Sequence, residues 1–298
     1  INPVAKNYIA FPYWGKPNTD GLEFTHQYNY SKNVSTGGNN DQLNFRVDQN
    51  VSEKQHLLAR YTRWKSANKE VDIYGNGLYT GDPYSPERFV TTQVVVADTY
   101  SFSPTTIFDI RLGFTRWEYD RTPGTTGINI PEATGLPSYY NQLDALRGLT
   151  GSTTIPTMSV SGYNAVSTGQ IYGITNNYTI SPSLIKTVGR HTLKFGADLR
   201  RLDLNYYQDN NPGGTFSFSN LFTSRNALNP GATGDSFASF LLGLPASGNV
   251  QTSLFSAAGM RYQGYYVNDT FQATNKLTLT FGVRWEIPGV YTERFDRQ

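Results

Sequence analysis

Residues 277–286 read LTLTFGVRWE, in which Leu, Phe, Val and Trp alternate with Thr, Gly, Arg and Glu. A period of two places the apolar set on one face of a β-strand and the polar set on the other. Just before this stretch, Tyr265, Val267 and Phe271 follow the same alternation, and a short polar segment at 273–276 joins the two runs. Together the two runs predict a β-hairpin.

The same pattern recurs along the chain. Short polar turns join three further pairs of alternating runs: 43–47 with 57–61, 94–102 with 108–114, and 171–180 with 193–199. Weaker strand signals lie near residues 23–31 and 250–256. No segment of useful length has helical periodicity. We therefore predict an all-β fold, an antiparallel up-and-down meander of about ten strands.

The connections between the hairpins are long. They span residues 66–88, 119–170 and 207–248, and they are rich in Gly, Pro, Ser, Asn and Tyr. A compact soluble domain rarely keeps several loops longer than about 15 residues. A barrel of the bacterial outer membrane has short turns on its periplasmic side and long loops on its extracellular side. The asymmetry therefore favours part of a large transmembrane β-barrel.

Composition excludes several classes of function. The chain has 298 residues, no Cys and three His, so disulfides, thiolate metal sites and cysteine nucleophiles are ruled out. The histidines are not spaced as metal ligands, and no G-x-S-x-G motif is present. A net charge of +2 is too small to indicate a nucleic-acid partner. We predict no enzyme activity, no catalytic residue, no metal and no cofactor.

Alternation alone does not decide which face meets water. In a soluble sandwich the apolar face forms a core, whereas in a membrane barrel it faces lipid and the polar face lines the lumen. The polar face mixes small residues with charges of both signs, and aromatic residues gather near strand ends, which favours the barrel. A secreted β-sandwich or β-solenoid stays the alternative. The predicted lumen-facing residues are Asp109, Arg111, Lys194, Asp198, Arg200, Arg284 and Glu286.

One loop carries adjacent aromatic residues, Tyr139 and Tyr140. Aromatic rings bury apolar area at a low entropic cost, so such a pair can stack on a sugar or a peptide. Tyrosine also anchors proteins at membrane interfaces. Tyr139 and Tyr140 are therefore candidate substrate-binding aromatics, with interfacial anchoring as an equal alternative.

Three stretches resemble the Oar-like TonB-dependent receptors. GDSFASFLLGLP at 234–245 resembles the family pattern G-x-x-F-A-D-F-L-L-G-x-P. YQGYYVNDTF at 262–271, followed by KLTLTFGVRWE at 276–286, is similar to the family's Y-x-F-Y-V-Q-D-D-W-K hairpin. GRHTLKFG at 189–196 is similar to its G-x-H-x-L-K-F-G strand. With a further likeness in residues 2–18, the resemblance covers nearly the whole chain.

The resemblance implies a larger parent protein with an N-terminal domain, a plug and a barrel of about 22 strands. Residues 1–298 would then be a single partial barrel domain without the plug, forming an open, curled sheet with two unpaired edges. The implied function is uptake of a large or scarce substrate, such as an oligosaccharide or a peptide, across the outer membrane of a Gram-negative bacterium. Its partners would be outer-membrane lipid, the plug and the TonB system. A passive porin and a secreted adhesin or glycan-binding module are the alternatives.

Overall fold

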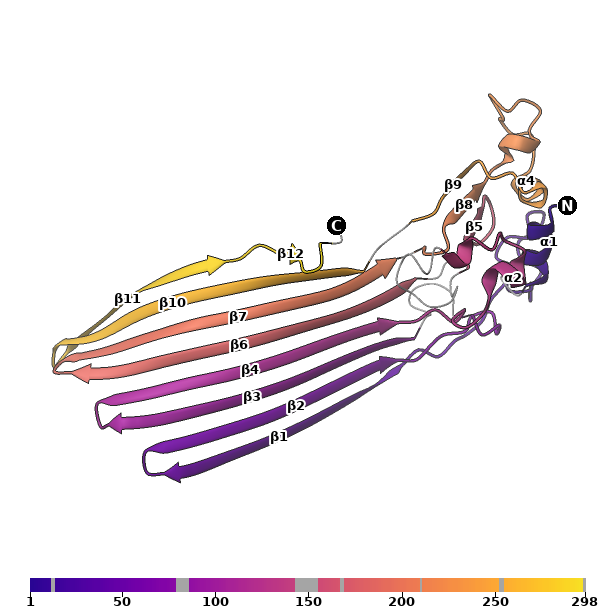
Figure 1. Cartoon of the computed structure of the whole chain (residues 1–298). Coiled ribbons are helices and arrows are strands. Elements are labelled where there is room, and N and C mark those ends of the chain that lie inside the picture. Colours follow the sequence, from indigo (N-terminus) through magenta and orange to yellow (C-terminus); the bar gives the residue numbers. More distant parts are fainter. Residues whose placement is uncertain are drawn as a thin grey trace.

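The computed structural model describes residues 1–11, 14–78, 86–142, 155–166, 169–209, 211–251 and 255–296. These residues form a long antiparallel sheet with a small folded cap at one end (Figure 1). The hairpin turns lie at the end of the sheet that is far from the cap, and the long connections run into the cap. The strands of the meander therefore form the sheet, and its long connections contribute to the cap.

The large sheet has nine strands in the part of the chain that the structure describes. Its main path is β1-β2-β3-β4-β6-β7-β10-β11, with every neighbouring pair antiparallel and with β12 paired to β10. The bounds are β1 Gly38–Ser52, β2 Gln55–Asn68, β3 Glu87–Ser103, β4 Thr106–Arg121, β6 Gln170–Val188, β7 His191–Asp209, β10 Ser256–Thr274, β11 Leu277–Pro288 and β12 Thr292–Glu293. The predicted all-β antiparallel meander is confirmed. Since β1 and β11 end the path, the sheet is open.

Tight turns set the register of the hairpins. Between β6 and β7, Val188 lies opposite His191 and Gly189 has a φ of +57°, which glycine adopts without a steric penalty. The other three hairpins each shift register just before the turn, at Asn50/Ser52, at Ser101/Ser103 and at Gln272/Thr274. Such bulges increase the local twist, and twist curls a sheet.

One face of the sheet is apolar over most of its length. Phe45, Tyr61, Val94, Phe114 and Tyr178 lie opposite one another on five successive strands. Many side chains of this apolar face are exposed: Leu43, Phe45, Val47, Val94, Val96, Leu112, Tyr178, Ile180, Phe195, Val267, Phe281 and Val283. Among the described residues, the substantial contacts of each long strand are with its neighbours in the same sheet. The sandwich alternative is wrong, because a sandwich would cover this face with a second sheet.

Toward the cap, the apolar face becomes charged. On β4, Phe114 is followed two residues later by Arg116, whose Nε lies 2.6 Å from Glu118 Oε1. On β7 the charge begins in the row of Phe114 and Tyr178 itself, because Arg201 lies opposite Tyr178, with its Nε 3.1 Å from Asp203 Oδ1. The apolar band therefore ends before the strands do.

The cap contains helix α1, which precedes β1, and the short elements that lie within the long connections between the strands of the large sheet. Its bounds are α1 Pro3–Ala10, α2 Ile130–Thr134, β5 Thr157–Val160, β8 Thr215–Phe218, η1 Asn220–Thr223, α4 Ser236–Leu242 and β9 Ser247–Asn249. Strand β8 pairs with β5 in parallel and with β9 in antiparallel fashion. A shared hydrophobic core is formed by Ala5, Tyr8, Ile130, Ile155, Met158, Val160, Val166, Phe218 and Phe240. Segments far apart in the sequence thus fold into one unit.

One expectation is wrong, and two others need to be stated more fully. Residues 23–31 form turns rather than a strand, since Phe24, His26 and Tyr28 have positive φ values. Short helices do form, and α4 begins where the Asp235 side chain accepts a hydrogen bond from the Ala238 amide and ends at Gly243, whose φ is +72°. The separate strand expected near 250–256 falls partly outside the described residues, and Ser256 opens the long strand β10. Within the described ranges, no helix is long and apolar enough to cross a membrane.

Candidate functional site

The seven predicted lumen-facing charges lie on one face of the sheet, opposite to the apolar face. Asp109, Ser183, Gly196, Tyr266 and Arg284 lie opposite one another on five neighbouring strands of the path. The remaining charges stand two or four positions from a member of this row, and residues two apart share a face of a strand: Arg111, Lys194, Asp198, Arg200 and Glu286. We call this side the polar face.

Five side chains of β7, β10 and β11 form an inner cluster on the polar face. The Arg200 guanidinium donates to both Asp198 oxygens, at 3.0 Å from Nε and 2.5 Å from Nη2. Arg284 donates to Glu286 at 2.6 Å and to the Tyr262 hydroxyl at 2.9 Å. Arg284 also lies 3.6 Å from Asp198. The opposite charges of the inner cluster therefore hold one another in a hydrogen-bonded network.

Aromatic rings pack beneath these cations. The Arg200 guanidinium lies 5.3 Å from the centre of the Tyr262 ring, and the Lys194 ammonium lies 6.0 Å from the centre of the Tyr266 ring. The Tyr266 ring covers Gly196, where an added Cβ would stand only 2.3 Å from the ring. Glycine at this position therefore lets the ring lie flat on the sheet.

Asp109 and Arg111 form a separate pair on β4, with Arg111 Nε 3.3 Å from Asp109 Oδ1. The Thr99 hydroxyl also donates to Asp109, at 2.8 Å. The structure thus divides the seven predicted residues into two groups. Five of them gather on β7 and β11, and the other two lie on β4.

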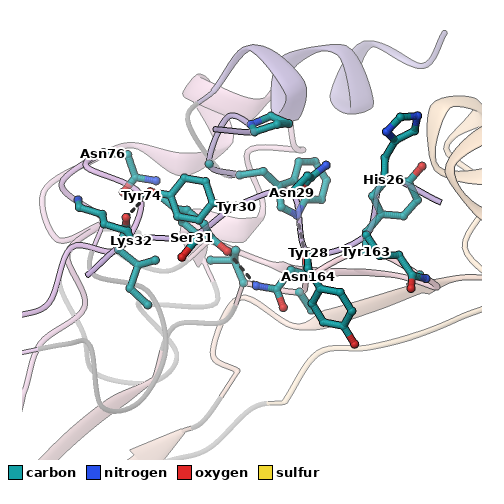
Figure 2. A pocket seen from close by; sticks show the side chains of 18 of the residues that line it. His26, Tyr28, Asn29, Tyr30, Ser31, Lys32, Tyr74, Asn76, Tyr163 and Asn164 are labelled. Carbon is teal, nitrogen blue, oxygen red and sulfur yellow. Dashed lines mark hydrogen bonds between the residues drawn. The ribbon is translucent and has the colours of Figure 1, made fainter. Parts of the chain in front are cut away.

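A second site lies in the cap. A cavity of about 1270 Å³, open to solvent on one side, is lined by residues of four segments, 14–32, 71–76, 162–166 and Phe237 of α4 (Figure 2). We call it the cap pocket. Lys32, Asn76, Tyr74 and Tyr30 lie toward one side of the view, and Tyr28, Tyr163 and His26 lie toward the other.

Aromatic rings and amides dominate the wall of the cap pocket. Tyr30 and Tyr74 meet edge to face with ring centres 5.2 Å apart, and Tyr163 stacks on Phe237 at 5.0 Å. Asn164 connects the walls, because its carbonyl accepts from the Trp14 indole at 2.8 Å and its side-chain amide donates to the Tyr74 hydroxyl at 2.9 Å.

The charged groups of the cap pocket are tied to the backbone. The Lys32 ammonium donates to the Asp72 carbonyl at 2.7 Å. The Asp72 carboxylate accepts from the amides of Asn76 and Gly77, at 3.1 and 2.8 Å. Within the described residues, no group of three or more His, Cys, Asp or Glu side chains could hold a metal ion. The wall therefore offers mainly rings, amides and hydroxyls.

Tyr139 and Tyr140 lie outside the residues that line the cap pocket. Tyr140 is buried, and Tyr139 is exposed and stacks on it with ring centres 5.1 Å apart. Sequence reasoning missed the pocket residues. The sequence feature that marks these residues is a mixture of aromatic and amide side chains in QYNYSK at 27–32 and in GYN at 162–164. Only the fold brings these two stretches together.

The sequence matches the family model described as "Outer membrane beta barrel domain" over residues 1–298. The chain belongs to this family, and it lies in the outer membrane. No curated protein matches it at a significant level.

Two solved structures match part of the chain. BauA, the ferric preacinetobactin receptor of Acinetobacter baumannii, is 13% identical with a TM-score of 0.44, covering 84% of this chain and 34% of BauA. The outer membrane transporter YddB of Escherichia coli is 12% identical with a TM-score of 0.34, covering 86% of this chain and 35% of YddB. The chain therefore spans about a third of the length of these structures.

In outer-membrane barrels generally, the apolar side chains of each strand face lipid and the alternating polar side chains face the lumen. A membrane-spanning strand needs about 9–11 residues, whereas β6, β7 and β10 have 19 residues each. These three strands are therefore longer than one membrane crossing requires.

Proposed function

We propose that the chain is part of the wall and the outer cap of an Oar-like TonB-dependent receptor, which takes up a large or scarce solute. The observation that carries this proposal is the folded cap. Its helices, its short sheet and its pocket stand over the end of a lumen-lining wall. A cap with its own core and binding cavity suits a receptor that captures a solute before passage.

A wide barrel would fit a gated pathway. The path of the sheet has eight strands and is open at β1 and β11, and in the proposed receptor further strands pair with both edges. Barrels of about 16–18 strands leave a water-filled channel, and those of about 22 strands are plugged. A plug would keep so wide a lumen from leaking, and the TonB system would supply the energy to move it.

Each surface then has a defined role. The apolar face contacts lipid, and the cap pocket captures the solute. The inner cluster contacts the plug or the passing solute, through hydrogen bonds that partial desolvation strengthens. The chain itself carries out no chemical step.

Conductance across a planar lipid bilayer tests this proposal. We expect the protein at its full natural length to insert without a steady open-channel current, because a plug fills the lumen. Steady, stepwise conductance from the intact protein would contradict the proposal and would identify a passive porin. A variant that lacks the residues preceding the barrel serves as the control, and it should conduct because its lumen is empty.

A further inference from the structure

We infer that the cap pocket binds a neutral oligosaccharide. This inference rests on the proposed receptor function, because it names the class of solute that the receptor captures. It is drawn from the wall of the cap pocket, from its size and from the conformation of its rim.

The wall matches the surface of a sugar chain. One side of a pyranose ring is a patch of C–H groups that packs on an aromatic face, while its hydroxyls both donate and accept hydrogen bonds. The cap pocket offers rings from Tyr28, Tyr30, Tyr74 and Tyr163. The side-chain amides of Gln27 and Asn29 make no hydrogen bond to any other described residue, so both can serve a ligand. A side-chain amide both donates and accepts, as a hydroxyl requires.

The charges favour a neutral ligand. Lys32 and Asp72 are the one lysine and the one acidic residue of the wall, so their opposite charges offset each other, and both also hydrogen-bond backbone groups. An anionic solute would need cations aimed into the cavity, and a peptide would need partners for its charged ends or a free strand edge. Besides Lys32 and Asp72, His26 is the lining residue whose side chain can carry a charge near neutral pH. A neutral, hydroxyl-rich chain needs none of these features.

The size favours several sugar units. A typical pocket for a small molecule has a volume of about 300–1,000 Å³. The cap pocket has about 1270 Å³. It therefore has room for an oligosaccharide rather than for a single sugar.

The rim displays aromatic rings at a conformational cost. In the segment 22–28, the φ values of Phe24, His26 and Tyr28 are +71°, +52° and +57°. A left-handed conformation is strained for a residue other than glycine. Phe24 and Tyr28 are nevertheless 90% and 83% exposed to water, and Tyr28 lines the pocket. Strain that holds exposed rings beside a cavity points to a ligand that would cover them.

A matched pair of substitutions tests the inference. Tyr163 lines the cap pocket and Tyr139 does not, yet each is 53% exposed and each stacks on one neighbouring ring, at 5.0 and 5.1 Å. The purified full-length protein is applied in detergent to an array of neutral glycans. We expect retention on one class of oligosaccharide. On that class Tyr163→Ala and Tyr28→Ala should weaken binding at least about tenfold, the loss of one to two stacked contacts, while Tyr139→Ala leaves it unchanged.

Three results would overturn the inference. The first is the absence of binding to any neutral glycan, and the second is binding that survives both pocket substitutions or is lost with Tyr139→Ala. The third is retention by an immobilised peptide library in place of glycans. Because binding in detergent needs no energised membrane, its outcome is independent of the conductance measurement. A protein that binds glycans and also conducts steadily would keep the pocket assignment and lose the TonB-dependent function.

Discussion

Replacing Phe240 by Ala is expected to lower the free energy of unfolding of the cap by about 3–5 kcal/mol, the usual cost of deleting a buried aromatic ring. Phe240 is 2% exposed, and its ring meets those of Trp14 and Phe218 edge to face at 5.5 and 5.3 Å. These contacts join α4 to the N-terminal segment and to β8. Hydrogen exchange of the α4 and β8 amides in the membrane-embedded protein measures the loss.

Phe222→Ala is the control for this prediction. Phe222 lies on η1 in the same cap, but its side chain is half exposed, so its removal should cost much less. Equal protection of the cap amides in both variants would show that the cap has no common core around Phe240. Loss of protection in the large sheet with Phe240→Ala would show that the cap and the wall unfold as one unit.

Replacing Phe195 by Arg is expected to destabilise the wall by about 2–4 kcal/mol, the cost of a cation at mid-depth in lipid. Phe195 lies on β7 between Leu184 of β6 and Val267 of β10, within the apolar face. The new guanidinium would have to leave water and enter the hydrocarbon layer. Denaturant unfolding of the protein in lipid vesicles measures the change.

Ser183→Arg gives the matched control on the polar face. Ser183 lies opposite Asp109 on β4 and Gly196 on β7, so an arginine there reaches water and an acidic neighbour. We expect a change close to zero. If the two arginines destabilised the wall equally, or if Ser183→Arg cost more, the assignment of the faces would be reversed or wrong.

The wall could be predicted from the sequence because its signal is local. Period-two alternation in residues 94–102 and 193–199 specifies both the strand and its two faces, and short polar turns specify the antiparallel pairing. The same alternation placed the seven charges on one face. It could not predict the hydrogen bonds of Arg284 to Glu286 and Tyr262, since these depend on the register between strands.

The cap could not be predicted because its stability comes from contacts between distant segments. Helix α1 lies near the N-terminus and α4 some 230 residues later, yet the Asn2 amide donates to the Leu241 carbonyl at 2.7 Å. A helix of seven residues such as α4 has too short a pattern to predict helix on its own. Tertiary packing also overrode the strand signal at 23–31, where the chain forms turns at the pocket rim.

The candidate pocket escaped prediction for the same reason. Its lining residues come from four segments, and each segment read alone is an ordinary polar loop with aromatic residues. Tyr139 and Tyr140 had the same local appearance, and the fold places them elsewhere in the cap. Local composition thus indicated aromatic side chains as candidates for binding, and only the fold shows which of them line a common cavity.

The most direct test of the account is to locate the two ends of the sheet relative to the outer membrane. Because the chain has no cysteine, one can be introduced at a time. Leu228→Cys marks an exposed position in the cap, and Lys54→Cys marks the turn between β1 and β2. A polyethylene-glycol maleimide too large for outer-membrane pores is applied to intact cells. We predict labelling of Leu228→Cys at once and of Lys54→Cys only after permeabilisation. Labelling of both in intact cells, or of Lys54→Cys alone, would contradict a wall that spans the outer membrane with its cap outside.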